Sequence, residues 1–344
     1  MNRAIALALA LVAAAIVQAP RAEAQEVTLR LHQMLPPQAA IPAKALTPWI
    51  EKVESQSGGR IQVEHYPSMQ LGGAPPALYD QAKDGVVDLI WTVLGYTPGR
   101  FPKSEAFELP FMVTTGEATS RAFHEYVLAH AMDEFKDVHP IVLHTHGPGL
   151  LHVRGQGVRS LADMAGLKIR TPTRVAAGML SAFGATPIGM PVPAVPESLS
   201  KGVIDGVAIP WEVTLPLKIA ELVSTHTGFS GRHGLYTSTF IFAMNRDSYD
   251  ALPADLKQVI DDNSGPQVAA LFGKAMDDVD VTGRAVAEKA GNTIITLDEA
   301  ETARWQEVAR KTTANWIAEM DGKGIDGAML VEDARQRIEK YSGQ

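Results

Sequence analysis

The sequence predicts an α/β fold with mostly parallel strands, and three observations support this prediction. The stretch from Gly166 to Glu212 alternates short apolar strands with helices, which is the pattern of an open α/β sheet. The N-terminal half shows the same alternation, so crossover connections between parallel strands are expected there too. The chain has 344 residues, of which 46% are hydrophobic, and this is enough for two domains with sizeable cores.

Residues 1–24 are predicted to be a signal peptide that does not belong to the folded protein. A short positive segment, Asn2-Arg3, precedes an apolar run from Ala4 to Val17, and Ala22-Glu23-Ala24 forms an A-x-A cleavage site. The apolar run is shorter than the roughly 20 residues that a membrane-spanning helix needs. We therefore expect export to the periplasm and a mature protein that begins at Gln25.

The composition argues against several classes of function. The formal net charge is −8 and no basic run occurs, which argues against nucleic acid as a partner. The chain contains no cysteine, which excludes disulfides, thiolate metal sites, cysteine nucleophiles and a lipid anchor on cysteine. No G-x-S-x-G, P-loop or G-x-G-x-x-G pattern is present.

The N-terminal half is predicted to place several side chains at strand ends. Strand 27–31 leads into a loop with Gln33 that is expected to face a crevice. The third strand ends with Trp91, and Tyr96 follows just beyond it. The other elements expected here are helices at 43–57 and 76–84 and strands at 61–66 and 86–92.

The central stretch places Arg170 at the end of a strand. Strand 167–171 stops before Pro172, because proline disfavours the helical conformation in the residue that precedes it. The third strand of this stretch, 203–209, stops at Pro210-Trp211. Ligands of open α/β sheets bind beyond the carboxyl ends of the strands, so Arg170 and Trp211 are expected at the rim of one crevice.

The rest of the chain is expected to cross twice between two lobes. The break at 147–149 marks the first crossing, and strand 235–245 is the return. This assigns residues 25–150 and 236–276 to lobe I and residues 151–235 and 277–344 to lobe II. Further strands are expected at 141–146, 151–154 and 294–297. Further helices are expected at 117–136, 215–223, 255–262, 267–289, 299–320 and 329–340.

Several segments, taken in order, resemble the solute receptors of TRAP transporters of the DctP type. They include GLKIRTP, FGATPIGMP and LSKGVIDG in the central stretch, SGGRIQVEHYPSMQLGG and GRFPKSEAFELPF before it, and MNRDSYDALPADLKQVI after it. The resemblance implies a two-lobed periplasmic-binding-protein clamshell with a long helix spanning both lobes, for which 267–289 is the candidate. It also implies a small organic carboxylate as ligand and a membrane permease of one small and one large subunit, driven by an ion gradient.

The resemblance makes Arg170 the anchor of the ligand carboxylate, because the family's anchor arginine occupies this KIR position. A guanidinium matches a carboxylate with two parallel hydrogen bonds. The alternative is a structural ion pair with an interior carboxylate. A second polar contact falls on Arg154 or, if the spacing from Asp163 is used instead, on Gln156.

Aromatic residues are candidates for the pocket wall, with ordinary core packing as the alternative. Trp91, Tyr96 and Trp211 are the main ones, with Gln33 and Phe240 as further ligand-binding candidates. Where relatives that bind hydroxylated acids often have a polar residue, this chain has Ile209. The sequence therefore predicts a monocarboxylate with a hydrophobic or aromatic body. Some keto-acid receptors use a Glu-Trp pair near this point to hold a metal. Glu212 is displaced from that position, but it remains a ligand-binding candidate.

No catalytic residue, cofactor or metal ligand is expected. His144 and His146 share one face of a strand and could start a zinc site, but no carboxylate motif accompanies them. Two other functions remain open at this point: a periplasmic enzyme acting on a carboxylate, with His32 or these two histidines, and a sensor input protein that passes its closed form to a signalling partner.

Overall fold

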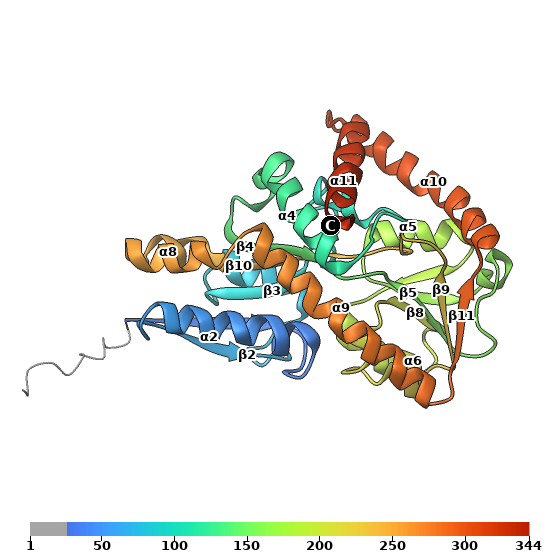
Figure 1. Ribbon diagram of the computed structural model, residues 1–344, viewed down its shortest axis with the longest axis horizontal. Helices are drawn as coiled ribbons and strands as arrows, with labels where there is room; N and C mark the ends of the chain where they lie inside the picture. Colours follow the sequence, from blue (N-terminus) through green and yellow to red (C-terminus); the bar gives the residue numbers. More distant parts are fainter. Residues whose placement is uncertain (1–25, 344) are drawn as a thin grey trace, which may run out of the picture.

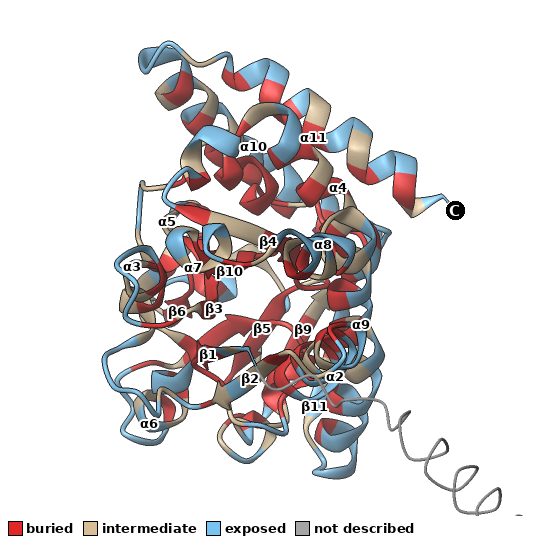
Figure 2. Ribbon diagram, turned by 90° about the vertical axis from the view of Figure 1, so that its left-hand side faces the viewer, coloured by how far each residue is buried: buried red, intermediate tan, exposed pale blue. Residues whose placement is uncertain are grey.

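The computed structural model describes residues 26–343, so the predicted signal peptide lies outside the described residues. Two lobes, each built on its own β-sheet, lie side by side with helices packed around them (Figure 1). The inner strands of both sheets consist largely of buried residues, whereas the helices show exposed outer faces (Figure 2). This is the two-lobed α/β architecture that the sequence predicts.

The first sheet has five strands in the order β2-β1-β3-β10-β4. β1 is parallel to both β2 and β3, whereas β10 is antiparallel to β3 and to β4. β10 therefore returns from the second lobe and completes the first sheet. The strands are β1 (Val27–Gln33), β2 (Ile61–Tyr66), β3 (Leu89–Val93), β4 (Val138–Thr145) and β10 (Thr239–Asn245).

The second sheet has six strands in the order β11-β9-β5-β8-β6-β7. β6 is parallel to β7 and β8, but β5 runs antiparallel to both of its neighbours, β8 and β9. The sheet is thus mixed, where the sequence predicted mostly parallel strands. The strands are β5 (Leu150–Val153), β6 (Lys168–Thr171), β7 (Thr186–Gly189), β8 (Gly206–Ile209), β9 (Thr225–Phe229) and β11 (Thr293–Leu297).

Most predicted helices form close to their predicted ends, with two differences. The helix expected at 215–223 is only a short 3-10 turn, η9 (Ile219–Glu221), and β9 follows where no strand was expected. The α-helices are α2 (Thr47–Gln56), α3 (Leu78–Lys83), α4 (Gly116–His130), α5 (Arg174–Ala182), α6 (Val195–Ser200), α7 (Arg246–Asp250), α8 (Ala254–Asp262), α9 (Pro266–Lys289), α10 (Glu299–Gly322) and α11 (Gly327–Ser342).

The C-terminal helices bridge the two lobes. α10 packs against α5, which follows β6 of the second sheet, whereas α11 packs against α4 of the first lobe (Figures 1 and 2). Residues 277–344 therefore do not contact lobe II alone. None of the helices within residues 26–343 combines the length and the apolar character needed to span a membrane.

The long helix α9 contacts both lobes along its length (Figure 1). Asp277 accepts hydrogen bonds from the backbone N–H groups of Gly116 (2.7 Å) and Glu117 (2.9 Å) at the start of α4. One turn later, Asp280 accepts from the backbone N–H of Glu212 (2.7 Å) in the second lobe. Carboxylates satisfy the free N–H groups at helix starts. Through these two aspartates, α9 binds the start of α4 in the first lobe and the start of the 3-10 turn at Glu212 in the second lobe.

Two glycines allow α9 to approach both lobes closely. A Cβ atom on Gly273 would lie 2.0 Å from the backbone oxygen of Gly116, and one on Gly283 would lie 2.3 Å from that of Trp211. Both distances are far shorter than van der Waals contact. Any side chain at either position would push the helix away from the lobe that it holds.

Candidate ligand-binding site

A largely apolar cavity lies between the two lobes, at the ends of β3, β6, β8 and β10. The space between its walls that atoms do not fill is about 400 Å³, and part of this space is open to solvent. Both lobes contribute to its wall. Its lining includes Met34, Leu35, Trp91, Val93, Tyr96, His146, Arg170, Pro172, Val192, Ile209, Pro210, Glu212, Val213, Tyr236, Ser238, Phe240 and Met276.

The chain turns sharply after Arg170 and so leaves its side chain at the cavity. β6 ends at Thr171, Pro172 prevents a helix from starting there, and Thr173 caps α5 by accepting a hydrogen bond from the backbone N–H of Ala176. The side chain of Arg170 therefore projects from a strand end that two local signals fix in place.

The guanidinium of Arg170 is buried without a carboxylate partner. The residue is 2% exposed, and Nε donates to the backbone oxygen of Met190 (2.9 Å) and Nη1 to that of Ala208 (3.2 Å). Nη2 lies 3.4 Å from the hydroxyl of Tyr96. No Asp or Glu within residues 26–343 forms an ion pair with it. Burying a charge without a counter-charge costs free energy. A bound anion from outside the chain would offset this cost, so the guanidinium is a candidate anion-binding group.

Three residues that line the cavity carry hydroxyl groups: Tyr96, Tyr236 and Ser238. The hydroxyl of Tyr96 accepts a hydrogen bond from the backbone N–H of Val192 (2.8 Å), which joins the two lobes. The hydroxyls of Tyr236 and Ser238 have no hydrogen-bond partner within residues 26–343. Burial raises the pKa of Tyr96 and of Tyr236, and the nearby Arg170 only partly offsets this. Both phenols are therefore neutral and can donate to an anion.

Flat aromatic rings form the wall contributed by the first lobe. Phe240 stacks on Trp91 with 5.2 Å between the ring centroids, and His144 stacks on the same Phe240 ring at 4.9 Å. The indole Nε1 of Trp91 donates to Nε2 of His144 (2.8 Å), so the polar atom of the indole is satisfied outside the cavity. The wall thus offers apolar surface, which favours an alkyl or aromatic ligand body.

The histidines near the cavity are neutral and fully used in hydrogen bonds. His146 donates through Nδ1 to the backbone oxygen of Gly147 (2.5 Å) and accepts through Nε2 from the backbone N–H of Ser238 (3.0 Å). Burial lowers the pKa of His146 to about 4 and that of His144 to about 3. Within residues 26–343, no group of three or more His, Asp or Glu side chains is placed to hold a metal ion.

Five of the nine side chains proposed from the sequence come together in this cavity. They are Arg170, Trp91, Tyr96, Glu212 and Phe240. The other four, Gln33, Arg154, Gln156 and Trp211, are not among the residues that line it.

Arg154 and Gln156 lie away from the cavity because β5 is antiparallel. The C-terminal end of β5 therefore points to the opposite edge of the sheet from the ends of β6 and β8. Both residues are exposed, and Nη1 of Arg154 donates to the backbone oxygen of Leu199 (3.3 Å). The placement at the crevice depended on a parallel β5, and this corrects it.

Trp211 and Gln33 are occupied by structural contacts. The indole of Trp211 packs on the imidazoles of His152 and His226, with ring centroids 5.0 and 4.7 Å away, in a small core of the second lobe. The side-chain amide of Gln33 exchanges hydrogen bonds with the backbone of Leu35, at 2.8 Å for the amide nitrogen and 2.5 Å for the oxygen. Core packing, the alternative for Trp211, is what the structure shows.

Sequence reasoning missed two polar residues of the cavity, Tyr236 and Ser238. They precede β10 and alternate with Phe240, so the three positions 236, 238 and 240 share one face of an extended segment. This period of two was the signal available in the sequence. Phe240, the only one of the three that was proposed, lies at the end of that series.

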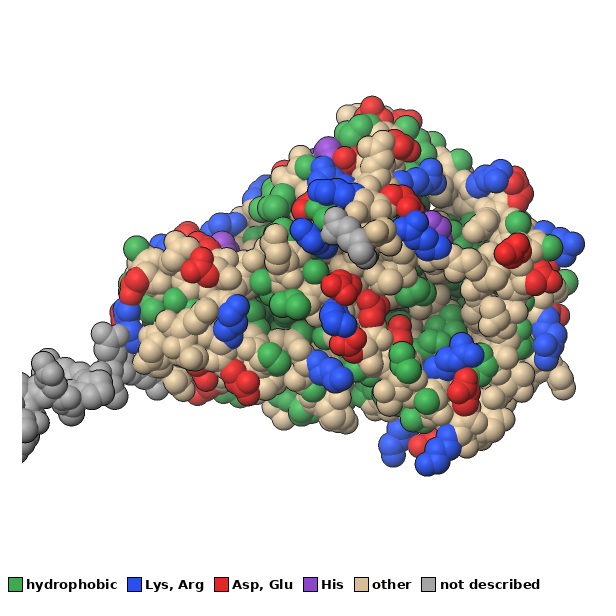
Figure 3. Space-filling view, in the orientation of Figure 1, with side chains coloured by type: hydrophobic (Ala, Val, Ile, Leu, Met, Phe, Trp, Pro, Cys, Tyr) green, Lys and Arg blue, Asp and Glu red, His purple; other side chains and the backbone are tan. Residues whose placement is uncertain are grey.

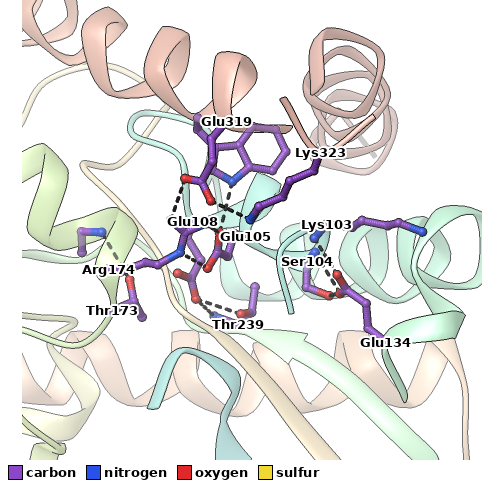
Figure 4. Close-up of polar contacts among 12 residues, drawn as sticks. Lys103, Ser104, Glu105, Glu108, Glu134, Thr173, Arg174, Thr239, Glu319 and Lys323 are labelled. Atoms are coloured by element: carbon purple, nitrogen blue, oxygen red, sulfur yellow. Dashed lines mark hydrogen bonds and ion pairs between the residues drawn. The ribbon is translucent and has the colours of Figure 1, made fainter. Parts of the chain in front are cut away.

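A second polar cluster lies beside the cavity, on the 3-10 turn η4 (Ser104–Glu108) and on α5 (Figure 4). Arg174 forms ion pairs with Glu105 of η4 and, at 2.7 Å, with Glu319 of α10. Trp316 donates from its indole to Glu105 (3.2 Å). The cluster therefore ties the N-terminal lobe to α5 and α10.

Glu108 completes the contact between η4 and both lobes. Its Oε1 accepts hydrogen bonds from the backbone N–H (3.1 Å) and the hydroxyl (2.8 Å) of Thr239 (Figure 4), and the hydroxyl of Thr173 in the second lobe also bonds to this carboxyl. Its Oε2 has no partner within residues 26–343. Burial, followed by the charge of Glu105, raises the pKa of Glu108 to about 7.

Solved structures with the same fold are known. A TRAP solute-binding protein from Rhodoferax ferrireducens, in complex with copurified benzoate, is 48% identical, with a TM-score of 0.90 over 92% of this chain and 99% of that chain. A marine metagenome TRAP solute-binding protein specific for aromatic acid ligands, in complex with 3-hydroxybenzoate, is 48% identical, with a TM-score of 0.91 over the same shares. A third, from Bordetella bronchiseptica with bound (R)- and (S)-mandelate, is 31% identical, with a TM-score of 0.85 over 91% of this chain and 99% of that chain.

The family model for bacterial extracellular solute-binding proteins, family 7 (DctP), matches residues 33–319. This match covers most of the described chain, including the whole second sheet, all strands of the first sheet except β1, and the whole cavity wall. Together with the buried arginine at the cavity and the two-lobed fold, it assigns the chain: this protein belongs to the family 7 extracellular solute-binding proteins, the solute receptors of TRAP transporters.

Proposed function

We propose that this protein is the periplasmic receptor of a TRAP transporter for a monocarboxylate with an aromatic body. The observation that carries the proposal is the buried guanidinium of Arg170, which has no carboxylate partner within residues 26–343 and lies beside apolar walls. The guanidinium would bind the carboxylate with charge-assisted hydrogen bonds. The hydroxyls of Tyr236 and Ser238 would donate to the remaining carboxylate lone pairs.

The walls support an aromatic body over a sugar acid. Trp91 and Phe240 offer stacked rings, and Ile209 and Met276 add further apolar surface. Each hydroxyl of a sugar acid that found no partner would cost about 1–3 kcal/mol. The relatives bound to benzoate, 3-hydroxybenzoate and mandelate, at 48%, 48% and 31% identity, support the same ligand class.

Ligand binding would be followed by delivery to the membrane. Closure of the two lobes around the ligand is a hinge motion known for this architecture, and the closed form would dock on a permease with one small and one large subunit.

The protein would be exported with its first 24 residues removed. On the face shown in Figure 3, acidic and basic side chains are interspersed, so that face offers no patch of one sign.

A panel of acids on ligand-stripped protein tests the proposal. Thermal shift should rise with benzoate, mandelate and hydroxybenzoates, because a ligand that binds only the folded state stabilises it. Succinate, glucuronate and sialic acid serve as controls and should give no shift at the same concentration. A shift with the sugar acids or succinate and none with any aromatic acid would overturn the proposed ligand class. Turnover of a bound acid would instead support the enzyme alternative.

A further inference from the structure

Glu212 lines the cavity, and its carboxyl group has no hydrogen-bond partner within residues 26–343. The residue is 2% exposed and belongs to the cavity lining. Its Oε2 is enclosed and unpartnered, and no hydrogen bond to Oε1 occurs within residues 26–343 either. Buried polar groups in folded proteins are nearly always hydrogen-bonded. An unpartnered carboxyl at the wall of an apolar cavity therefore calls for a partner from the ligand.

The backbone fixes this carboxyl in position. Glu212 begins the 3-10 turn η8 (Glu212–Thr214) directly after Pro210-Trp211. Asp280 of α9 accepts hydrogen bonds from the backbone N–H of Glu212 (2.7 Å) and from that of Trp211. Since these contacts use the main chain, the side chain of Glu212 remains free to contact a ligand.

The surroundings of Glu212 favour the protonated form of its carboxyl, because burial, followed by the charge of Asp280, raises the pKa of Glu212 well above its usual range. A protonated carboxyl offers one O–H donor and a carbonyl acceptor. A hydroxyl group has the same combination of donor and acceptor, so the two groups can satisfy each other. A second ligand carboxylate would add a negative charge next to Asp280.

Arg170 and Glu212 line the cavity from different elements, β6 and η8. The guanidinium of Arg170 lies beside the hydroxyl of Tyr96, whereas the backbone of Glu212 is hydrogen-bonded to Asp280 of α9. In the proposed orientation, the ligand carboxylate lies at Arg170 and the other end of the ligand extends toward Glu212. The remaining lining of the cavity is largely apolar.

We propose that Glu212 is a specificity-determining residue that hydrogen-bonds a hydroxyl on the ligand ring, at the end remote from the carboxylate. The ligand class is then a hydroxylated aromatic monocarboxylate rather than an unsubstituted one. This inference rests on the proposed function, because it needs an aromatic carboxylate in the cavity with its charge at Arg170.

The ligand side of the test uses the unaltered mature protein. Dissociation constants for benzoate, 3- and 4-hydroxybenzoate, and 3- and 4-methylbenzoate are measured by calorimetry at pH 7.5 after the protein is stripped of ligand. One hydroxybenzoate should bind at least about tenfold more tightly than benzoate and than its methyl counterpart of similar size. This comparison does not depend on whether any variant folds.

The protein side of the test uses a matched pair of variants. Glu212→Gln keeps a neutral donor and acceptor of the same shape and should preserve most of the preference for the hydroxyl. Glu212→Met keeps the length but removes both hydrogen-bonding functions, and the ratio of the benzoate to hydroxybenzoate dissociation constants should fall to about one. Circular dichroism and thermal melting confirm that both variants are folded.

Each outcome decides between the two proposals. A preference for the hydroxyl that disappears in Glu212→Met and survives in Glu212→Gln supports the inference. Benzoate binding as tightly as both hydroxybenzoates, or a preference that persists in Glu212→Met, overturns the role of Glu212 and leaves the proposed function intact. Failure of every aromatic acid to bind the folded protein overturns the proposed function and this inference with it.

Discussion

Arg170 and Arg174 lie four residues apart in the sequence and in two different environments. Arg170 is buried at the cavity, where its guanidinium contacts two backbone oxygens and a phenol hydroxyl. Arg174, on the first turn of α5, forms ion pairs with Glu105 and Glu319. Arg170 is thus available to a ligand, whereas Arg174 connects the two lobes. The two environments differ because acidic residues from other segments lie next to Arg174 and not next to Arg170.

The largest expected effect is on binding and follows from removal of the unpaired guanidinium. Arg170→Lys should weaken binding of an aromatic acid at least about tenfold, because the point charge of an ammonium cannot form the two parallel hydrogen bonds of a planar guanidinium. Arg170→Ala should weaken binding about a hundredfold, because it removes the charge as well. Calorimetry with benzoate or a hydroxybenzoate measures this. Arg154→Ala, which removes an exposed arginine away from the cavity, is the matched control. Equal affinity in all four proteins would remove Arg170 from the site.

The paired arginine should instead affect stability. Arg174→Met leaves the buried carboxyl of Glu105 without its main partner, which should lower the free energy of unfolding by about 2–3 kcal/mol. The double variant Arg174→Met, Glu105→Gln should recover part of this loss, because the stranded charge is gone. Denaturant melts of both variants measure the change. A single variant as stable as the natural protein would show that the ion pairs contribute nothing.

Glu108 lies between the two regions and should make stability depend on pH. Its pKa is raised from 4.5 to about 7 in the folded protein, so the folded state binds the proton more tightly than the unfolded state does. This contribution is complete below pH 4.5 and is lost as the pH rises through 7, by up to about 3 kcal/mol. Glu108→Gln does not titrate. The melting temperature of this variant, relative to the natural protein, should therefore be higher at pH 8 than at pH 5. A difference that does not change with pH would contradict the raised pKa.

The smallest expected effect comes from the contact that joins the lobes beside Arg170. Tyr96→Phe removes the acceptor of the Val192 N–H and a neighbour of the guanidinium, which should cost about 1 kcal/mol, or about fivefold in affinity. Small-angle scattering over a ligand titration should show that the variant needs a higher ligand concentration to reach full closure than the natural protein does. Unchanged affinity would mean that this hydroxyl contributes neither to closure nor to binding.

The sequence predicted local features whose causes are local. The long helix was expected at 267–289 and is found at Pro266–Lys289, because its apolar spacing continues without a break. The end of the strand at Arg170 was fixed by the proline two residues later. In both cases the deciding interactions lie within a few residues of one another, so the sequence contains them directly.

Features that depend on strand pairing could not be predicted in this way. Arg154 was placed at the crevice on the assumption of a parallel strand, and the antiparallel pairing of β5 with β8 and β9 puts it at the opposite edge. Trp211 was expected to line the pocket, but its ring packs on two histidines brought there by β5 and β9. Neither pairing has a signal within the segment itself.

The sequence by itself determined that an arginine stands at the end of β6, that a proline stops the strand there, and that the chain belongs to a family of solute receptors. Only the tertiary structure decided that, among the residues it describes, Arg170 has no counter-charge whereas Arg174 has two, and Glu212 is buried at the same cavity without a hydrogen-bond partner. The physical reason is that burial and charge pairing depend on residues distant in sequence, here from η4, α9 and α10, which the fold alone brings together.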